Sequence, residues 1–252
     1  MKAWLIRITK SFLVVLAYLI LSLIGPGWVY YTGDIDLKLP WYAFTNSESK
    51  INLDSVETNQ AVVRIYAARA YNWRGLFAVH PWLLIKEKGL DNFQRIEILG
   101  WRQGSLGKIS IKNGGLDSNW FGNPAELVHE LSGRQAEIAI PKIYQLIKDY
   151  PYKEDYKAYP GPNSNTFMSY IVENTNEIVT TLPPLAIGQR YPIEGKIISW
   201  STDPIKFQIS LWGHFGFVIG QNEGVRFFLF GVEWGINPWL FKIVIPGIGV
   251  IG

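Results

Sequence analysis

A long apolar stretch lies near the N-terminus of the chain. Residues 12–31 are strongly hydrophobic and carry no charged side chain. As a helix, this stretch crosses a hydrocarbon core of ~30 Å at ~1.5 Å per residue. It ends with Trp28, Tyr30 and Tyr31, and such aromatic side chains are enriched at membrane interfaces. The pattern predicts a transmembrane anchor over residues 1–31. A cleaved signal peptide is the alternative, but its apolar region is only ~7–15 residues long.

Hydrophobic and polar positions alternate in several later segments. Residues 32–60 are polar and rich in turn-forming residues, which is typical of a linker. From residue 61 onward, apolar side chains recur at every second position, the period of a β-strand. In residues 93–101, for example, Glu97 falls on one face while Ile96 and Ile98 fall on the other. Strands are predicted at 61–68, 76–85, 93–101 and 108–112.

Helix signals dominate residues 123–178. Asn123 followed by Pro124 matches an N-cap residue with proline at the first helical position, so we expect a helix over 123–131. A second helix begins at Pro141 or, kinked by that proline, near Arg134. It is predicted from a three- and four-residue spacing of the apolar residues Ile143, Leu146, Ile147 and Tyr150. A third helix is expected after residues 162–165, with Phe167, Tyr170 and Ile171 on one face.

The C-terminal part returns to strands. Phe207, Ile209 and Leu211 alternate with polar residues, and residues 222–224 fit a hairpin turn. Residues 207–252 are hydrophobic enough to suggest a second membrane span. Every window of ~20 residues there contains a charge, however, which excludes that span. The segment predicts a β-meander that is buried or partly faces the membrane. The whole chain is therefore expected to be α+β, with residues 61–252 as a single domain that combines mixed antiparallel sheet with helices.

The charge distribution suggests an orientation. Lys2, Arg7 and Lys10 precede the apolar stretch, and the first charges after it are Asp34 and Asp36. The positive-inside rule then places the N-terminus in the cytoplasm and the domain outside it, as in a single-pass protein of the cell envelope. The three basic residues account for the whole formal net charge of +3. Because the remainder is neutral, nucleic acid is not an expected partner.

Cysteine and histidine usage limits the chemistry. The chain has no Cys, which excludes disulfides, thiolate zinc sites and iron–sulfur clusters. Three His residues are present, so we expect neither a metal centre nor a cofactor.

Two segments are candidates for a functional site. His80 lies in an apolar strand and must pair its ring nitrogens; a satisfied core histidine is the simplest interpretation, and a catalytic base is the functional one. Residues 159–167 lead through Pro-Gly-Pro into a helix N-terminus, which presents free backbone N–H groups. Asn163 or Ser164 is either an ordinary N-cap or, for Ser164, a nucleophile beside an oxyanion site.

These segments carry a family resemblance. The chain resembles a bacterial family known as domain of unknown function 3750, from about Ala68 to the C-terminus. The family has no assigned activity. The most specific segment is YPGPNSNTFMSYI at 159–171. The other segments that carry the resemblance are ARAYNWRGLFAVHPW (68–82), ILGWR (98–102), WFGNPAELV (120–128), IPKIYQLIKDYPY (140–152) and LPPLAIGQRY (182–191).

A more distant resemblance suggests chemistry. The chain is similar to circularly permuted papain-like hydrolases and acyltransferases, which place a His on an early strand and a nucleophilic Cys at the start of a later helix. This resemblance implies His80 as base and Ser164 in place of the Cys. A third residue that orients the His would come from the next strand, where Glu97 and Gln94 are the candidates.

Two functions follow from these observations. The first is a non-catalytic domain that binds an envelope peptide, glycan or lipid; its candidate binding residues are Arg74, Trp82, Tyr159, Asn163 and Asn165. The alternative is a serine-dependent hydrolase or acyltransferase that uses His80, Ser164 and Glu97. The absence of Cys favours the binding domain.

Overall fold

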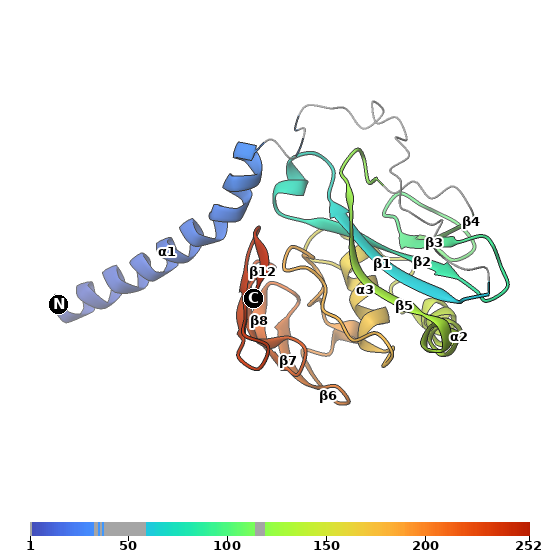
Figure 1. Ribbon diagram of the computed structural model, residues 1–252. Helices are drawn as coiled ribbons and strands as arrows, with labels where there is room; N and C mark the ends of the chain where they lie inside the picture. Colours follow the sequence, from blue (N-terminus) through green and yellow to red (C-terminus); the bar gives the residue numbers. More distant parts are fainter. Residues whose placement is uncertain (1, 33–34, 36, 38–58, 114–118) are drawn as a thin grey trace.

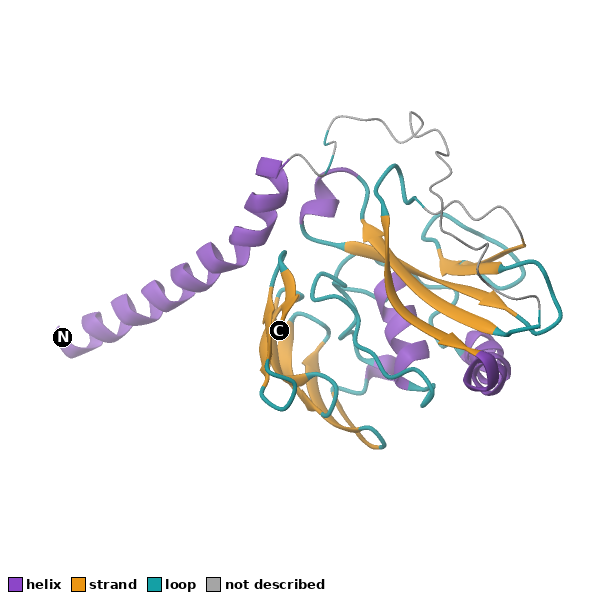
Figure 2. Ribbon diagram, in the orientation of Figure 1, coloured by secondary structure: helices purple, strands orange, loops and turns teal. Residues whose placement is uncertain are grey.

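The structure, a computed structural model, describes residues 2–32, 35, 37, 59–113 and 119–252. Most of the predicted linker at 32–60 lies outside the described residues. The rest forms an N-terminal helix, two antiparallel sheets and further helices (Figures 1 and 2). The α+β prediction is confirmed.

Helix α1 (Lys2–Thr32) contains the predicted apolar stretch. Within the described part of the chain, it is the one helix that is long and apolar enough to cross a membrane. Most of its hydrophobic side chains are exposed, and it projects away from the remainder of the molecule (Figure 1). An exposed apolar helix is unstable in water and stable in lipid, which agrees with the predicted anchor.

The first sheet has five strands in the order β4-β3-β2-β1-β5. Its first four strands lie in the segments predicted from alternation. The second of them starts later than expected, because Asn72–Leu76 forms the short 3-10 helix η2. The strands are β1 (Val62–Arg69), β2 (Val79–Lys86), β3 (Gln94–Ile98), β4 (Ile109–Asn113) and β5 (Ala125–Ser132).

The helix predicted over 123–131 is wrong. This segment contains β5, which pairs antiparallel with β1 at the edge of the sheet. The Asn123 side chain donates to the Arg69 carbonyl at 3.0 Å and caps no helix. The local N-cap pattern was outweighed by strand pairing and by the packing of Leu131 into the core.

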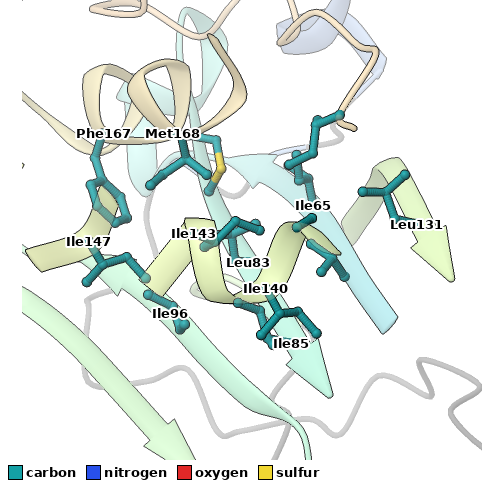
Figure 3. Close-up of a cluster of buried hydrophobic side chains, with 14 of the residues drawn as sticks. Ile65, Leu83, Ile85, Ile96, Leu131, Ile140, Ile143, Ile147, Phe167 and Met168 are labelled. Atoms are coloured by element: carbon teal, nitrogen blue, oxygen red, sulfur yellow. The ribbon is translucent and has the colours of Figure 1, made fainter. Parts of the chain in front are cut away.

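Two helices cover the core side of this sheet. Helix α2 (Gly133–Asp149) contains Pro141, so the longer of the two predicted alternatives is correct. Helix α3 (Ser164–Glu173) confirms the third prediction. Figure 3 shows how aliphatic side chains of the strands meet those of α2 and α3. The core includes Ile65, Leu83, Ile96, Ile140, Ile143, Ile147, Phe167 and Met168, all buried. Each side chain of this kind contributes roughly 1.5–3 kcal/mol through its burial.

The second sheet is a seven-stranded meander. Its strands follow one another in sequence order, which confirms the predicted meander. They are preceded by a short 3-10 helix, η3 (Ile193–Gly195). The strands are β6 (Ile198–Thr202), β7 (Ile205–Leu211), β8 (Phe215–Gly220), β9 (Gly224–Leu229), β10 (Val232–Asn237), β11 (Lys242–Ile245) and β12 (Gly249–Ile251).

Candidate functional site

A cavity of about 490 Å³ lies where η2, the start of β2 and the N-terminus of α3 meet. Its walls are mainly aromatic. Trp73, Trp101 and Tyr159 are partly exposed, so the cavity opens to the outside. The other aromatic residues that line it are Tyr71, Phe77, Trp120, Phe121 and Tyr156.

The cavity collects most of the residues predicted for the site. Arg74, His80, Tyr159, Asn163, Ser164 and Asn165 all line it. Trp82 does not; it is fully buried two positions beyond His80, with its ring 4.1 Å from the Arg95 guanidinium. Gln94 lies apart and accepts a hydrogen bond from Tyr144 at 2.8 Å. Glu97 lies behind the cavity wall and reaches the site through His80.

His80 is held by a buried carboxylate on the neighbouring strand. Its Nε2 lies 2.9 Å from Oε2 of Glu97, and the Trp120 ring stacks on the imidazole at 3.6 Å between centroids. Burial lowers the pKa of His80, and the bond to Glu97 offsets this only in part. The imidazole is therefore neutral at pH 7, donating from Nε2 with Nδ1 as its acceptor atom.

Glu97 is kept ionised by its partners. Arg95 donates to both carboxylate oxygens at 3.0 Å. Burial raises the pKa of Glu97, but the His80 hydrogen bond and the Arg95 charge outweigh burial and lower it to about 2. The His80, Glu97 and Arg95 side chains thus form a fixed, buried chain of hydrogen bonds behind the cavity.

The start of α3 is fixed by Asn163, the N-cap residue. Its Oδ1 accepts from the backbone N–H groups of Asn165 at 2.9 Å and Thr166 at 3.2 Å. Its Nδ2 donates to the Ala158 and Ile187 carbonyls, both at 3.0 Å. The predicted N-cap is therefore confirmed, and the same side chain also ties two loops to the helix.

We expect Asn163→Ala to lower the free energy of unfolding by about 2 kcal/mol, the upper end of the range for N-caps, because four hydrogen bonds are lost. Chemical denaturation followed by circular dichroism measures this. Asn163→Ser is the matched variant: its hydroxyl keeps a capping acceptor and loses the two loop contacts, so it should cost less. Equal losses in both variants would contradict the capping role.

Asn165 carries an unpaired acceptor. Its Nδ2 donates to the Val79 carbonyl at 3.0 Å and to the Ile187 carbonyl at 2.8 Å, which fixes the orientation of the amide. Its Oδ1 is buried and has no hydrogen-bond partner among the described residues. Leaving such an oxygen unpaired costs ~1–3 kcal/mol. Because Asn165 lines the cavity, this oxygen is a candidate acceptor for a donor on a bound molecule.

Ser164, the first residue of α3, is buried at the cavity wall. Tyr156 lines the same cavity. Burial raises the pKa of Tyr156, while the Ser164 hydroxyl and backbone lower it. Within the described residues, the hydrogen bond found for the His80 ring is the one with Glu97. His80 and Ser164 share the cavity without a hydrogen bond between them.

Part of the aromatic wall was not predicted from the sequence. Trp120 and Phe121 stand in a tight turn closed by paired backbone hydrogen bonds between Trp120 and Asn123, and Phe121 has a φ of +47°. Asn123 and Pro124, which follow these two residues, predict a helix start, and that local pattern does not reveal the turn. No cluster of three or more metal-ligating side chains is found in the part of the chain that the structure describes.

Fold and site together define an α+β domain that follows an apolar helix and contains an aromatic cavity. The profile of a family described as "Protein of unknown function (DUF3750)" matches residues 60–191, more than half of the chain. The chain belongs to this family. The match ends before the seven-stranded sheet, although the resemblance was expected to reach the C-terminus. No curated protein and no solved structure matches the chain.

Proposed function

We propose that this protein is a membrane-anchored binding domain whose cavity takes a lipid-like ligand with an apolar body and one hydrogen-bond donor. The observation that carries the proposal is the unpaired Oδ1 of Asn165 in an aromatic-lined cavity. Ligand sites typically combine apolar walls with a few placed polar groups. Among peptide, glycan and lipid ligands, a lipid fits better than a glycan. A glycan carries many hydroxyls, and this cavity could not supply hydrogen-bond partners for them.

The position of the cavity supports a lipid ligand over a peptide. Helix η2 contributes Trp73 and Arg74 to the wall and contacts α1. The cavity therefore opens beside the helix that we expect to lie in the membrane. A lipid-like molecule could enter from the bilayer without crossing water.

The test is photo-crosslinking of the full chain in lipid nanodiscs. The probe is a long-chain fatty alcohol with a diazirine in its alkyl chain, whose single hydroxyl can donate to Asn165. We expect crosslinks to Trp120 or Phe77, and about a tenfold weaker capture by Asn165→Leu, equivalent to the ~1.4 kcal/mol of one hydrogen bond. Gln94→Leu, which removes an amide outside the cavity, should capture the probe like the wild type. Equal capture by both variants would refute the proposal.

A serine-dependent hydrolase or acyltransferase is the second candidate. It is favoured by the His80–Glu97 pair and by the presence of Ser164 in the same cavity. In such an enzyme Nδ1 of His80 would take the Ser164 proton, and the start of α3 would stabilise an oxyanion. A fluorophosphonate that labels Ser164 in the wild type but not in His80→Ala would support the enzyme. The binding proposal expects no labelling in either.

We also propose the extracytoplasmic orientation that the charges around α1 indicate. The chain has no Cys, so Lys88→Cys introduces a single thiol at an exposed turn of the domain. In intact cells, a membrane-impermeant maleimide should label Lys88→Cys as fully as it does after lysis. Labelling that requires lysis would reverse the orientation.

A further inference from the structure

The seven-stranded sheet has its hydrophobic side facing outward. On β7, Lys206, Gln208 and Ser210 are buried, whereas Phe207 and Leu211 are exposed. An antiparallel sheet with one solvated side normally shows the reverse pattern. We call the side that carries Phe207 the outer face.

Hydrophobic residues form continuous rows across the outer face. Strand pairing links Trp200 on β6 through Phe207, Ile219, Val225 and Ile236 to Ile251 on β12. A second row links Ile198, Ile209, Phe217, Phe227 and Trp234. Several members are half-exposed or more, such as Trp200 at 74% and Ile236 at 53%. Soluble proteins rarely expose an apolar surface this continuous unless it binds a partner or a membrane.

The charged side chains of the strands all lie on the side of the sheet opposite the outer face. Within residues 198–251, which the structure describes throughout, the charged strand residues are Lys206, Arg226, Glu233 and Lys242. The first three are buried, and Lys242 pairs with the buried Asn237 on the same side. The outer face of the strands therefore carries no charge.

Helix α1 meets the sheet on its outer face. The Tyr18 ring lies 6.2 Å from Phe227 and 6.5 Å from Trp234, and both partners belong to the second row. The Tyr18 hydroxyl donates to the Leu229 carbonyl at 3.2 Å, and the Trp234 indole donates to the Ser22 hydroxyl at 3.3 Å. Tyr18 and Ser22 fall inside the apolar stretch 12–31, so the outer face continues the surface of the helix that we expect to be surrounded by lipid.

From this continuity we infer that the outer face of β6–β12 is a membrane-docking surface that rests on the lipid leaflet around the C-terminal half of α1. The rows present hydrophobic side chains to the acyl chains, while the buried charges stay on the side away from the bilayer. The contacts of Tyr18 and Ser22 place part of the outer face beside the apolar stretch of α1, so its rows meet the acyl chains of the leaflet.

The test uses single-cysteine variants of the full chain. Ile219→Cys on the outer face, and Val225→Cys on the adjacent strand, are labelled with a bimane fluorophore. The protein is reconstituted into phosphatidylcholine–phosphatidylglycerol vesicles that contain lipids with doxyl groups on their acyl chains. Lys88→Cys, in the turn after β2, is the matched control. We expect doxyl lipid to remove most of the fluorescence at 219 and 225 and iodide to remove little, with the reverse at 88.

Two results would overturn the inference. If iodide quenches the fluorophores at Ile219→Cys and Val225→Cys as strongly as the one at Lys88→Cys, the outer face is in water. Shielding from both quenchers, together with disulfide crosslinking between two Ile219→Cys chains, would mean that a second copy covers the face. Photo-crosslinking in the cavity is independent of both results, so this surface and the proposed ligand site are tested separately.

Discussion

Replacing Glu233 by alanine should lower the free energy of unfolding by about 3–5 kcal/mol, the usual effect of removing one partner from a buried ion pair. Glu233 is buried and accepts from Arg190 at 2.7 Å and from Arg226 at 3.3 Å. Without it, two buried guanidinium groups lose the carboxylate that they share. Domains of this size are stable by only ~5–15 kcal/mol, so the loss is a large share of the total.

Urea denaturation of the full chain in detergent micelles, followed by circular dichroism, measures the loss. Lys88→Ala removes one partner of the exposed pair with Glu137, which has a separation of 3.0 Å, and should cost less than ~1 kcal/mol. Glu233→Gln keeps one acceptor oxygen and should fall between the two. A Glu233→Ala variant as stable as Lys88→Ala would show that the buried ion cluster does not hold the meander in place.

The local sequence predicted those helices and strands for which the local pattern and the tertiary packing favour the same secondary structure. The apolar stretch of α1, the alternation in β1 to β4 and the cap at Asn163 each specify an element by short-range chemistry. Residues 125–132 could not be predicted in this way. Their helix start signal is genuine, but pairing with β1 outweighs it, and pairing partners distant in sequence leave no local signal.

Alternation has a second limit, which the meander illustrates. A period of two along Phe207, Gln208 and Ile209 shows that two faces exist, but not which one is buried. The buried side became polar because Arg190 and Glu173, outside the meander, supply charge partners for its ionic residues. Such partners are visible only in three dimensions.

The candidate site was predictable to the extent that its residues are chemically unusual for their surroundings. His80 is a polar residue within an apolar strand, and Asn163 and Asn165 follow a rigid Pro-Gly-Pro sequence. Glu97 could be proposed because it lies on the next strand. Trp120 and Phe121 could not, since aromatic residues are common in cores and only the turn geometry stacks Trp120 on His80 and places both residues in the cavity wall.

Glu97 offers the second large effect, and its size depends on pH. At pH 7, Glu97→Gln should lower the free energy of unfolding by roughly 3 kcal/mol. The pKa of Glu97 is about 2 in the folded protein, against 4.5 for an ordinary Glu. At ~1.4 kcal/mol for each pH unit of difference, this shift corresponds to the expected loss. Because the folded pKa is the lower one, the stabilisation is fully present above pH 4.5 and disappears as the pH falls to 2.

Unfolding free energies of the wild type and Glu97→Gln, measured from pH 7 to pH 2, test this directly. Their difference should stay constant down to about pH 4.5 and approach zero near pH 2, where the wild-type carboxyl is protonated in both states. His80 adds to the acid sensitivity. Because its pKa is lowered in the folded state, protonation below its ordinary pKa of 6.5 favours the unfolded chain and lowers the free energy of unfolding. A difference between the two proteins that does not change with pH would mean that Glu97 acts by packing alone, and that its charge does not hold His80 and Arg95 behind the cavity.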